Sequence, residues 1–345
     1  MTNLLRLAAL AAVFLPLPGN SHTAPLPPGR GAMLHAHNCY PEQGLWADRI
    51  ERALDTGARP IAIEQDVAWD ARRGAPVVSH EPELSGAEPT LEAYFFDRMA
   101  PILDRALAEG RSASWPLYVL HLDFKTNEPD HHRAIWALLG KYERWLTTAR
   151  RGADAAQVQP FAPGPLLVLT ENGDNQAATF HDVVPAGGRL RIFGTLPSAV
   201  RVPSGDREAQ LDAVFHAPPA TLIPGRATNY RRWTNFAWAA VERGGQARAG
   251  AWTPADHARL KAIVDRAHAM GLWVRFYTLN GHAPGEGLGW TESYNFGSID
   301  AVRPRWRAAI ETGLDFVATD QYEAFARELA RPPIFQQPGA ATGYD

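Results

Sequence analysis

Short apolar runs alternate with stretches of helical periodicity along most of the chain. The apolar runs predict buried strands at residues 32–37, 60–67, 76–79, 117–124, 165–170, 190–194, 212–216, 272–279 and 314–319. The periodic stretches predict helices at residues 44–56, 90–109, 129–150, 254–270, 302–312 and 321–330. Repeated strand-then-helix units indicate an α/β protein with a mostly parallel sheet, either closed as a barrel or open and doubly wound.

Residues at the predicted helix ends support this pattern. Thr253 suits an N-cap, and Pro254 suits the first helical position that follows it. Glycines stand where four of the helices should end, at Gly57, Gly110, Gly271 and Gly313. No glycine-rich phosphate loop follows the first strand, which argues against a dinucleotide-binding fold.

The middle of the chain, residues 171–252, is irregular and rich in Gly, Pro and Trp. We interpret it as long loops of the same barrel rather than as a second domain. A single α/β barrel commonly fills a length of 345 residues. We therefore predict one (β/α)8 TIM barrel over residues 32–330, irregular in its middle strands, with a C-terminal tail at residues 331–345.

The first residues are typical of an exported protein. Arg6 precedes an apolar run over residues 7–15, which prolines and small residues then interrupt. The run is shorter than the roughly 20 residues that span a bilayer. We predict a signal peptide at residues 1–24, a Pro-rich linker at 25–31, and a secreted or periplasmic protein. A short retained membrane anchor is the alternative.

Composition narrows the chemistry. Hydrophobic residues make up 46% of the chain, as expected for a protein with a sizeable core. The net charge is −3 and no basic tract occurs, so we expect no nucleic-acid partner. Cys39 is the one cysteine, which excludes an internal disulfide and a thiolate metal cluster. A metal ion would therefore need oxygen and imidazole ligands.

Polar residues gather where the first four predicted strands end. They are His35, His37, Glu64, Asp66, His80, His121, Asp123 and Lys125. Residues two apart on a strand point to one face, so Glu64 and Asp66 project together. The C-terminal ends of barrel strands form the active-site face, and we expect these side chains to converge there.

Each residue type in this set suits a step of metal-assisted hydrolysis. Three carboxylates offer the oxygen ligands that Mg2+ or Ca2+ prefers. Histidines from two loops can act as base and acid, and Lys125 can neutralise phosphate charge. Taken singly, such residues are more often solvated or bonded to backbone. The shared site is indicated by their occurrence together, with His121 one step deeper than Asp123.

Several segments resemble the superfamily of phosphatidylinositol-specific phospholipase C-like phosphodiesterases, which includes glycerophosphodiester phosphodiesterases and sphingomyelinase D-type phospholipases. The segments are residues 35–40 (HAHNCY), 63–67 (IEQDV), 78–81 (VSHE), 122–125 (LDFK), 273–280 (WVRFYTLN) and 313–320 (GLDFVATD). The resemblance covers about residues 32–327. The HAHN opening is most similar to a branch that includes a yeast protein named for altered inheritance of mitochondria.

The resemblance implies roles for these residues. His37 and His80 match the catalytic histidines, Lys125 a phosphate-binding lysine, and Asn38 a metal-contacting asparagine. Glu64, Asp66 and Asp123 match the metal ligands. The glycerophosphodiesterase pattern His-Arg-Gly is absent, because Asn38 and Cys39 replace Arg-Gly. Against the sphingomyelinase D pattern His35 is the match instead of His37, so both stay candidates for the first catalytic histidine.

The expected function is hydrolysis of a phosphodiester small molecule or lipid headgroup, through a cyclic phosphate, by a monomer in transient contact with a membrane surface. One alternative is an amidohydrolase-type metal hydrolase, because His-x-His also opens those barrels; it would use His216 and Asp320. The other is a non-catalytic barrel that binds lipid headgroups or glycans through its tryptophans. Residues such as Arg231, Arg232, Arg275 and Trp290 are candidates for shaping the pocket.

Overall fold

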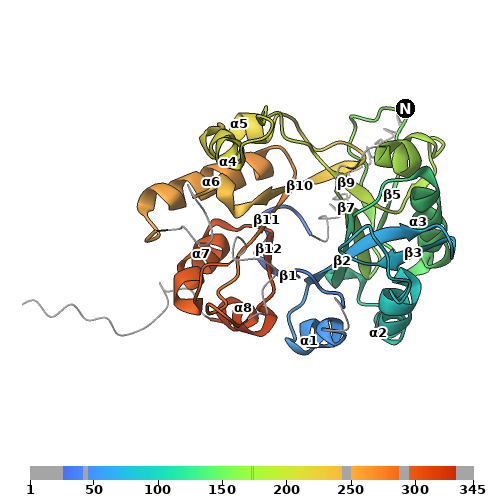
Figure 1. Ribbon diagram of the computed structural model, residues 1–345. Helices are drawn as coiled ribbons and strands as arrows, with labels where there is room; N and C mark the ends of the chain where they lie inside the picture. Colours follow the sequence, from blue (N-terminus) through green and yellow to red (C-terminus); the bar gives the residue numbers. More distant parts are fainter. Residues whose placement is uncertain are drawn as a thin grey trace, which may run out of the picture.

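The computed structural model describes residues 26–41, 46–171, 173, 175–242, 250–286 and 295–331. In this part of the chain, parallel strands form a closed barrel with helices around it (Figure 1). In order around the barrel the strands are β1 (Met33–Ala36), β2 (Ile61–Asp70), β4 (Tyr118–Phe124), β7 (Leu166–Thr170), β9 (Phe193–Thr195), β10 (Arg231–Ala237), β11 (Trp273–Tyr277) and β12 (Phe316–Thr319). Both β2 and β12 pair with β1, which closes the sheet. The predicted (β/α)8 barrel is confirmed.

Helices connect the strands and cover the outside of the barrel (Figure 1). They are α1 (Arg49–Asp55), α2 (Asp97–Glu109), α3 (Pro129–Lys141), α4 (Arg207–His216), α5 (Pro219–Leu222), α6 (Pro254–Ala269), α7 (Ile299–Thr312) and α8 (Tyr322–Leu329). Short π- and 3-10-helical turns accompany them: η1 (Glu92–Phe96), η2 (Ser112–Ser114), η3 (Glu143–Trp145), η4 (Ala178–Asp182) and η5 (Trp238–Ala240). No helix among the described residues is long and apolar enough to cross a membrane.

Alternate residues of each strand divide between two cores. Leu34 of β1 and Ile63 of β2 pack in the larger core between strands and helices. Met33 and Ala62, their neighbours in sequence, pack in a smaller core inside the barrel. Leu26 belongs to this inner core, and its carbonyl accepts a hydrogen bond from the Trp273 indole at 2.9 Å. The N-terminal end of the barrel is therefore filled by apolar side chains.

A hairpin extends one barrel strand beyond the sheet. β2 pairs with β4 up to Val67, and its last residues pair with β3 (Ala75–Val78) in antiparallel orientation. The outer edge of β3 is covered in turn, because Val78 N donates to Pro89 O and Val77 forms a bridge with Thr90. A separate small sheet consists of β5 (Thr148–Arg150), β6 (Phe161–Ala162) and β8 (Arg189–Leu190).

The middle of the chain departs most from the expected elements. Residues 212–216, predicted as a strand, form the end of α4, which begins after an Asp206 N-cap. Strand β10 was not predicted, because Arg231, Arg232 and Asn235 interrupt its apolar pattern. The helix predicted at residues 129–150 ends at Lys141, and the strand predicted at 190–194 is divided between β8 and β9. The predicted signal peptide, residues 42–45 and the tail beyond Arg331 lie outside the described residues.

Candidate functional site

Strand register places the candidate residues at two levels of the barrel interior. Glu64 of β2 pairs with His121 of β4, and Asp66 pairs with Asp123 two residues further along. On β1 the corresponding pair is His35, inside the strand, and His37, just past its end. The deeper level therefore holds imidazoles and Glu64, and the upper level lies at the C-terminal ends of the strands.

Three carboxylates converge where the two levels meet. Glu64, Asp66 and Asp123 each offer an oxygen within 4.8 Å of the others. Lys125 Nζ lies 2.8 Å from both Asp66 Oδ2 and Asp123 Oδ2. The Tyr40 hydroxyl donates to Asp66 Oδ2 at 2.8 Å. The structure thus brings together the three acidic residues and the lysine that the sequence predicted to share a site.

The charges of this carboxylate group are only partly balanced by the protein. Burial and the charge of Asp123 raise the pKa of Asp66 well above its ordinary value, although Lys125 opposes the shift. Burial and the charge of Glu171 likewise raise the pKa of Asp123. Like charges held close together in a buried site disfavour ionisation, and a cation relieves that cost. The oxygen donor set therefore fits a hard divalent cation such as Mg2+ or Ca2+.

Glu64 is the most heavily contacted of the three carboxylates. Its Oε1 accepts from Arg275 at 2.8 Å, and its Oε2 accepts from the backbone N–H of Asn38 at 3.0 Å. His37 Nε2 lies 3.7 Å from Oε2. Burial alone would raise the pKa of Glu64, but the Arg275 guanidinium and the nearby histidines outweigh it, so the pKa lies well below the usual range. Glu64 is therefore ionised at neutral pH.

His37 stands at the barrel mouth with a buried carboxylate behind it. Its Nδ1 lies 3.2 Å from Oδ1 of Asp320, the residue that follows β12. Asn280 donates to Asp320 Oδ2 at 2.6 Å, and Arg49 lies 3.4 Å from Oδ1. With a proton on Nδ1, His37 donates to Asp320 and keeps a lone pair on Nε2, as a general base requires.

Asn38 supports the site through its backbone and its amide. The residue has a positive φ of 49°, which asparagine tolerates better than most residues. Its side-chain nitrogen donates to Asp320 Oδ1 at 3.0 Å, and its side-chain oxygen lies 2.9 Å from the Tyr40 hydroxyl oxygen. The oxygen that a metal ion would need is thus directed toward Tyr40.

His80 reaches this region by a route that differs from the predicted one. We expected a barrel strand to carry it, but β3 runs antiparallel to β2 and lies outside the barrel. The hairpin nevertheless returns to the barrel mouth, because Ser79 N donates to Asp66 O at 3.0 Å. His80 follows directly, half-exposed, with Nδ1 2.8 Å from Glu81 Oε1.

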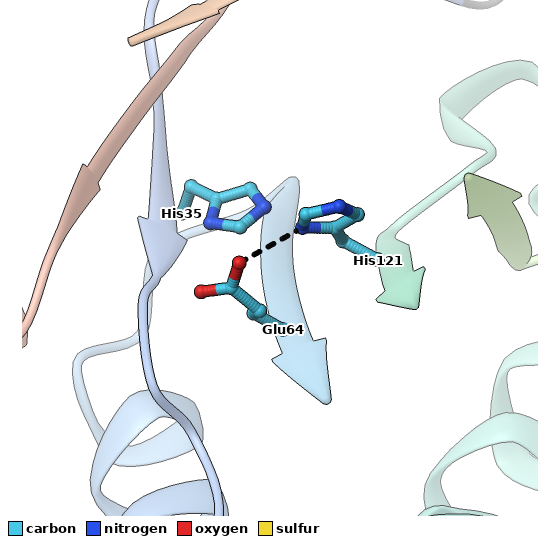
Figure 2. Close-up of side chains that lie close together, drawn as sticks. All are labelled: His35, Glu64 and His121. Atoms are coloured by element: carbon cyan, nitrogen blue, oxygen red, sulfur yellow. Dashed lines mark ion pairs between the residues drawn. The ribbon is translucent and has the colours of Figure 1, made fainter. Parts of the chain in front are cut away.

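His35 lies deeper than His37 and contacts other residues. Its ring is edge-on to His121 at 5.2 Å between centroids and close to Glu64 (Figure 2). Burial and the positive charge of Arg275 lower the pKa of His35 well below its ordinary value, so the ring is neutral. Of the two candidates for the first catalytic histidine, His37 is therefore the one at the barrel mouth.

Four residues of the site received no role from the resemblance. Tyr40, Asn280 and Asp320 lie in the resembling segments, but only Asp320 was given a use, in the amidohydrolase alternative, and Glu171 was not named. Glu171 follows β7 directly, so its place after a predicted strand was a usable signal. The amidohydrolase alternative also required His216, which lies on helix α4 and not at a strand end.

No protein-family model and no curated protein matches the sequence. Among solved structures, the chain is similar to phosphatidylinositol-specific phospholipase C from Listeria monocytogenes, with a TM-score of 0.45 and 10% identity over 90% of this chain and 97% of that one. HPPK-DHPS from Plasmodium falciparum has a TM-score of 0.41 and 7% identity over 87% of this chain and 48% of that one. A Coxiella burnetii dihydropteroate synthase has a TM-score of 0.32 and 16% identity over 86% of this chain and 88% of that one. All three scores are below 0.5, so the chemistry must be argued from this chain's own residues.

Proposed function

We propose that this protein is a metal-dependent phosphoric diester hydrolase. The observation that carries the proposal is the carboxylate group of buried Glu64 and Asp66 and half-buried Asp123, with Lys125 beside it and His37 at the same barrel mouth. The proposed substrate is a phosphodiester small molecule or a lipid headgroup. Export and transient contact with a membrane surface remain predictions from the sequence.

The residues divide the proposed reaction among themselves. His37, oriented by Asp320, takes a proton through Nε2 from a hydroxyl of the substrate itself. That oxygen forms a new bond to phosphorus, the bond to the leaving oxygen breaks, and His80 supplies the proton that the leaving oxygen gains. The product is a cyclic phosphate that water can open. Lys125 stabilises the negative charge on the phosphate oxygens.

A divalent cation has a defined place in this scheme. Glu64, Asp66 and Asp123 would hold it, and when bound it supplies electrostatic stabilisation of phosphate charge. Arg275 and Lys125 are the protein's own cations at the site, contacting Glu64 and the two aspartates respectively. Arg275 and Lys125 are positively charged whether or not a metal ion is bound. Loss of activity when the divalent cation is removed therefore tests the role of the cation directly.

The test is a screen of the purified protein against phosphodiesters that carry a hydroxyl able to attack phosphorus, namely glycerophosphodiesters, phosphatidylinositol and sphingomyelin. Each is assayed with EDTA, Mg2+ or Ca2+. We expect turnover with one cation and a loss of roughly 100-fold or more in Asp123→Asn and His37→Gln. The matched control is Asp130→Asn, an exposed carboxylate on α3, which should keep full activity.

Two results would reject the proposal. Absence of turnover for every diester with either cation would favour the non-catalytic barrel that binds headgroups or glycans. Turnover that persists undiminished in folded Asp123→Asn and His37→Gln would place the chemistry elsewhere in the chain.

A further inference from the structure

Three side chains form a second cluster below the carboxylate group, inside the barrel. His35 of β1, Glu64 of β2 and His121 of β4 each offer a donor atom within 4.8 Å of the others. Figure 2 shows the three side chains projecting into the same space between their strands. Their exposed fractions are 1%, 3% and 0%, so water does not compete for these donors.

One of the two imidazoles lacks hydrogen-bond partners. Within the described part of the chain, neither ring nitrogen of His35 has a hydrogen bond, whereas His121 lies between the carboxylates of Glu64 and Glu171. Aromatic rings form the surrounding walls, with Trp233 4.9 Å from His121 and Phe316 6.1 Å from His35 between ring centroids. Buried polar atoms nearly always have a partner, so the His35 ring indicates a missing ligand.

We propose that His35, Glu64 and His121 form a binding site for a divalent transition-metal ion of the Zn2+ and Co2+ class. Two imidazole nitrogens and one carboxylate oxygen are a common zinc donor set, whereas Mg2+ and Ca2+ prefer oxygen alone. His121 Nδ1 and Glu64 Oε1 lie 3.2 Å apart. Ligands about 2.0 Å from a tetrahedral ion stand about 3.3 Å apart, so the separation of this pair is close to the one required.

The surroundings orient the ligands and supply charge. His121 Nε2 lies 3.5 Å from Glu171 Oε1, and a carboxylate behind a histidine fixes the tautomer that a metal needs. Arg275 opposes the ion because it occupies Glu64 Oε1. Two carboxylates, Glu64 and Glu171, against one guanidinium leave a net charge of −1 beside the ion. Glu171 is also about one-third exposed, which gives the ion an approach from the barrel mouth.

Glu64 belongs to both clusters, and this sharing has a functional consequence. An ion held by His35, Glu64 and His121 makes Glu64 unavailable to the upper carboxylate group. It also places a positive charge beside the position that Mg2+ or Ca2+ would occupy. Zn2+ should therefore inhibit the proposed hydrolase in competition with Mg2+ or Ca2+. This consequence rests on the proposed function, whereas the binding of the ion does not.

The binding test uses Co2+ as a spectroscopic probe on the purified full chain, equilibrated slowly or refolded with the ion because the site is buried. Wild type should bind one equivalent with the visible absorption of a low-coordinate site, and Zn2+ should abolish that absorption. Folded His35→Phe and His121→Gln should each bind Co2+ at least roughly 100-fold more weakly. Asp66→Asn, which alters only the upper group, should keep the signal, as should the control His216→Asn on α4.

Each outcome decides the question. Absence of the Co2+ signal in wild type would overturn the proposal, as would an unchanged signal in either folded histidine variant. Loss in Asp66→Asn with retention in His35→Phe would assign the ion to the carboxylate group instead. If wild type binds Co2+ as expected but hydrolyses no phosphodiester, the proposed function fails and this site stands.

Discussion

At the scale of single residues, strand pairing explains how the histidine at the barrel mouth obtains its partner. The register pairs Ala36 of β1 with Thr319 of β12. His37 and Asp320, the next residue on each strand, therefore meet although 283 positions separate them in sequence. Asp320 is buried, and its contacts to Asn280 and Arg49 hold it in place. In the proposed reaction it is a positioning residue for His37.

Asp320→Asn should lower kcat roughly 10- to 100-fold with little change in KM, because the imidazole loses the carboxylate that orients it. Steady-state kinetics measure kcat and KM separately. Glu323→Gln, a half-exposed carboxylate on α8, is the control. An unchanged kcat in the folded Asp320→Asn variant would contradict the positioning role.

His131 makes stability depend on pH. Burial lowers its pKa from 6.5 to about 4. The unfolded chain therefore binds a proton more readily, and the contribution to stability is present above pH 6.5 and is lost as pH falls toward 4. Its full size is about 3 kcal/mol. His131→Phe keeps the packing against Phe124 and should flatten the fall in unfolding free energy between these pH values. Urea titrations at several pH values measure it, and an unchanged slope would refute it.

The sequence reveals some of the site residues and conceals others for physical reasons. Glu64, Asp66 and Asp123 could be predicted, because alternation within a strand sets which side chains share a face. Asp320 and Asn280 acquire their roles from contacts between distant segments, which a local pattern does not contain. The deeper cluster needs the register of Glu64 with His121, which becomes known only when two strands pair.

At the scale of elements, the sequence pattern did not predict the direction of β3 or the existence of β10. The run at residues 76–79 was correctly predicted as a strand, but its direction depends on the turn that follows Asp70. β10 was not predicted, because its apolar run is interrupted. Asn235 is an example of the polar residues that occupy interior positions near the barrel mouth.

The N-cap of α6, Thr253, allows a quantitative test of how much helix capping contributes to stability. Thr253 Oγ1 accepts from Asp256 N at 3.3 Å, and the Asp256 side chain accepts from Thr253 N at 2.9 Å. Thr253→Ala should lower the unfolding free energy by about 1 kcal/mol, because the backbone N–H of Asp256 loses its partner. Chemical denaturation measures the change. Thr253→Ser retains the hydroxyl and should restore most of it, and equal losses in both variants would argue against capping.

At the scale of the whole molecule, the barrel interior changes character along its axis. Apolar residues such as Met33 and Phe316 fill the N-terminal part, and charged residues occupy the C-terminal part. Burying like charges is unfavourable without a cation, so the end that carries the site is stabilised less than the end that carries the core. A ligand that binds the folded state alone should recover part of that stability.

Mg2+ or Ca2+ should therefore raise the melting temperature. At a concentration 100 times the dissociation constant the gain is about 2.7 kcal/mol. Asp66→Asn removes one of the three carboxylates and should abolish most of the gain, whereas the exposed variant Asp130→Asn should retain it. Differential scanning fluorimetry with each cation and with EDTA measures the shift. Equal shifts in both variants would mean that the cation binds elsewhere.

The covered edge of β3 has a consequence for how copies of this protein behave at high concentration. A barrel that closes on itself offers no unpaired strand, and β3 is the strand that the nine-stranded sheet adds outside the closure. Its outer side is occupied by Pro89 and Thr90, and Pro76 lacks the N–H that a further strand would need. Strand-by-strand aggregation through this sheet is therefore blocked at the position where it would begin.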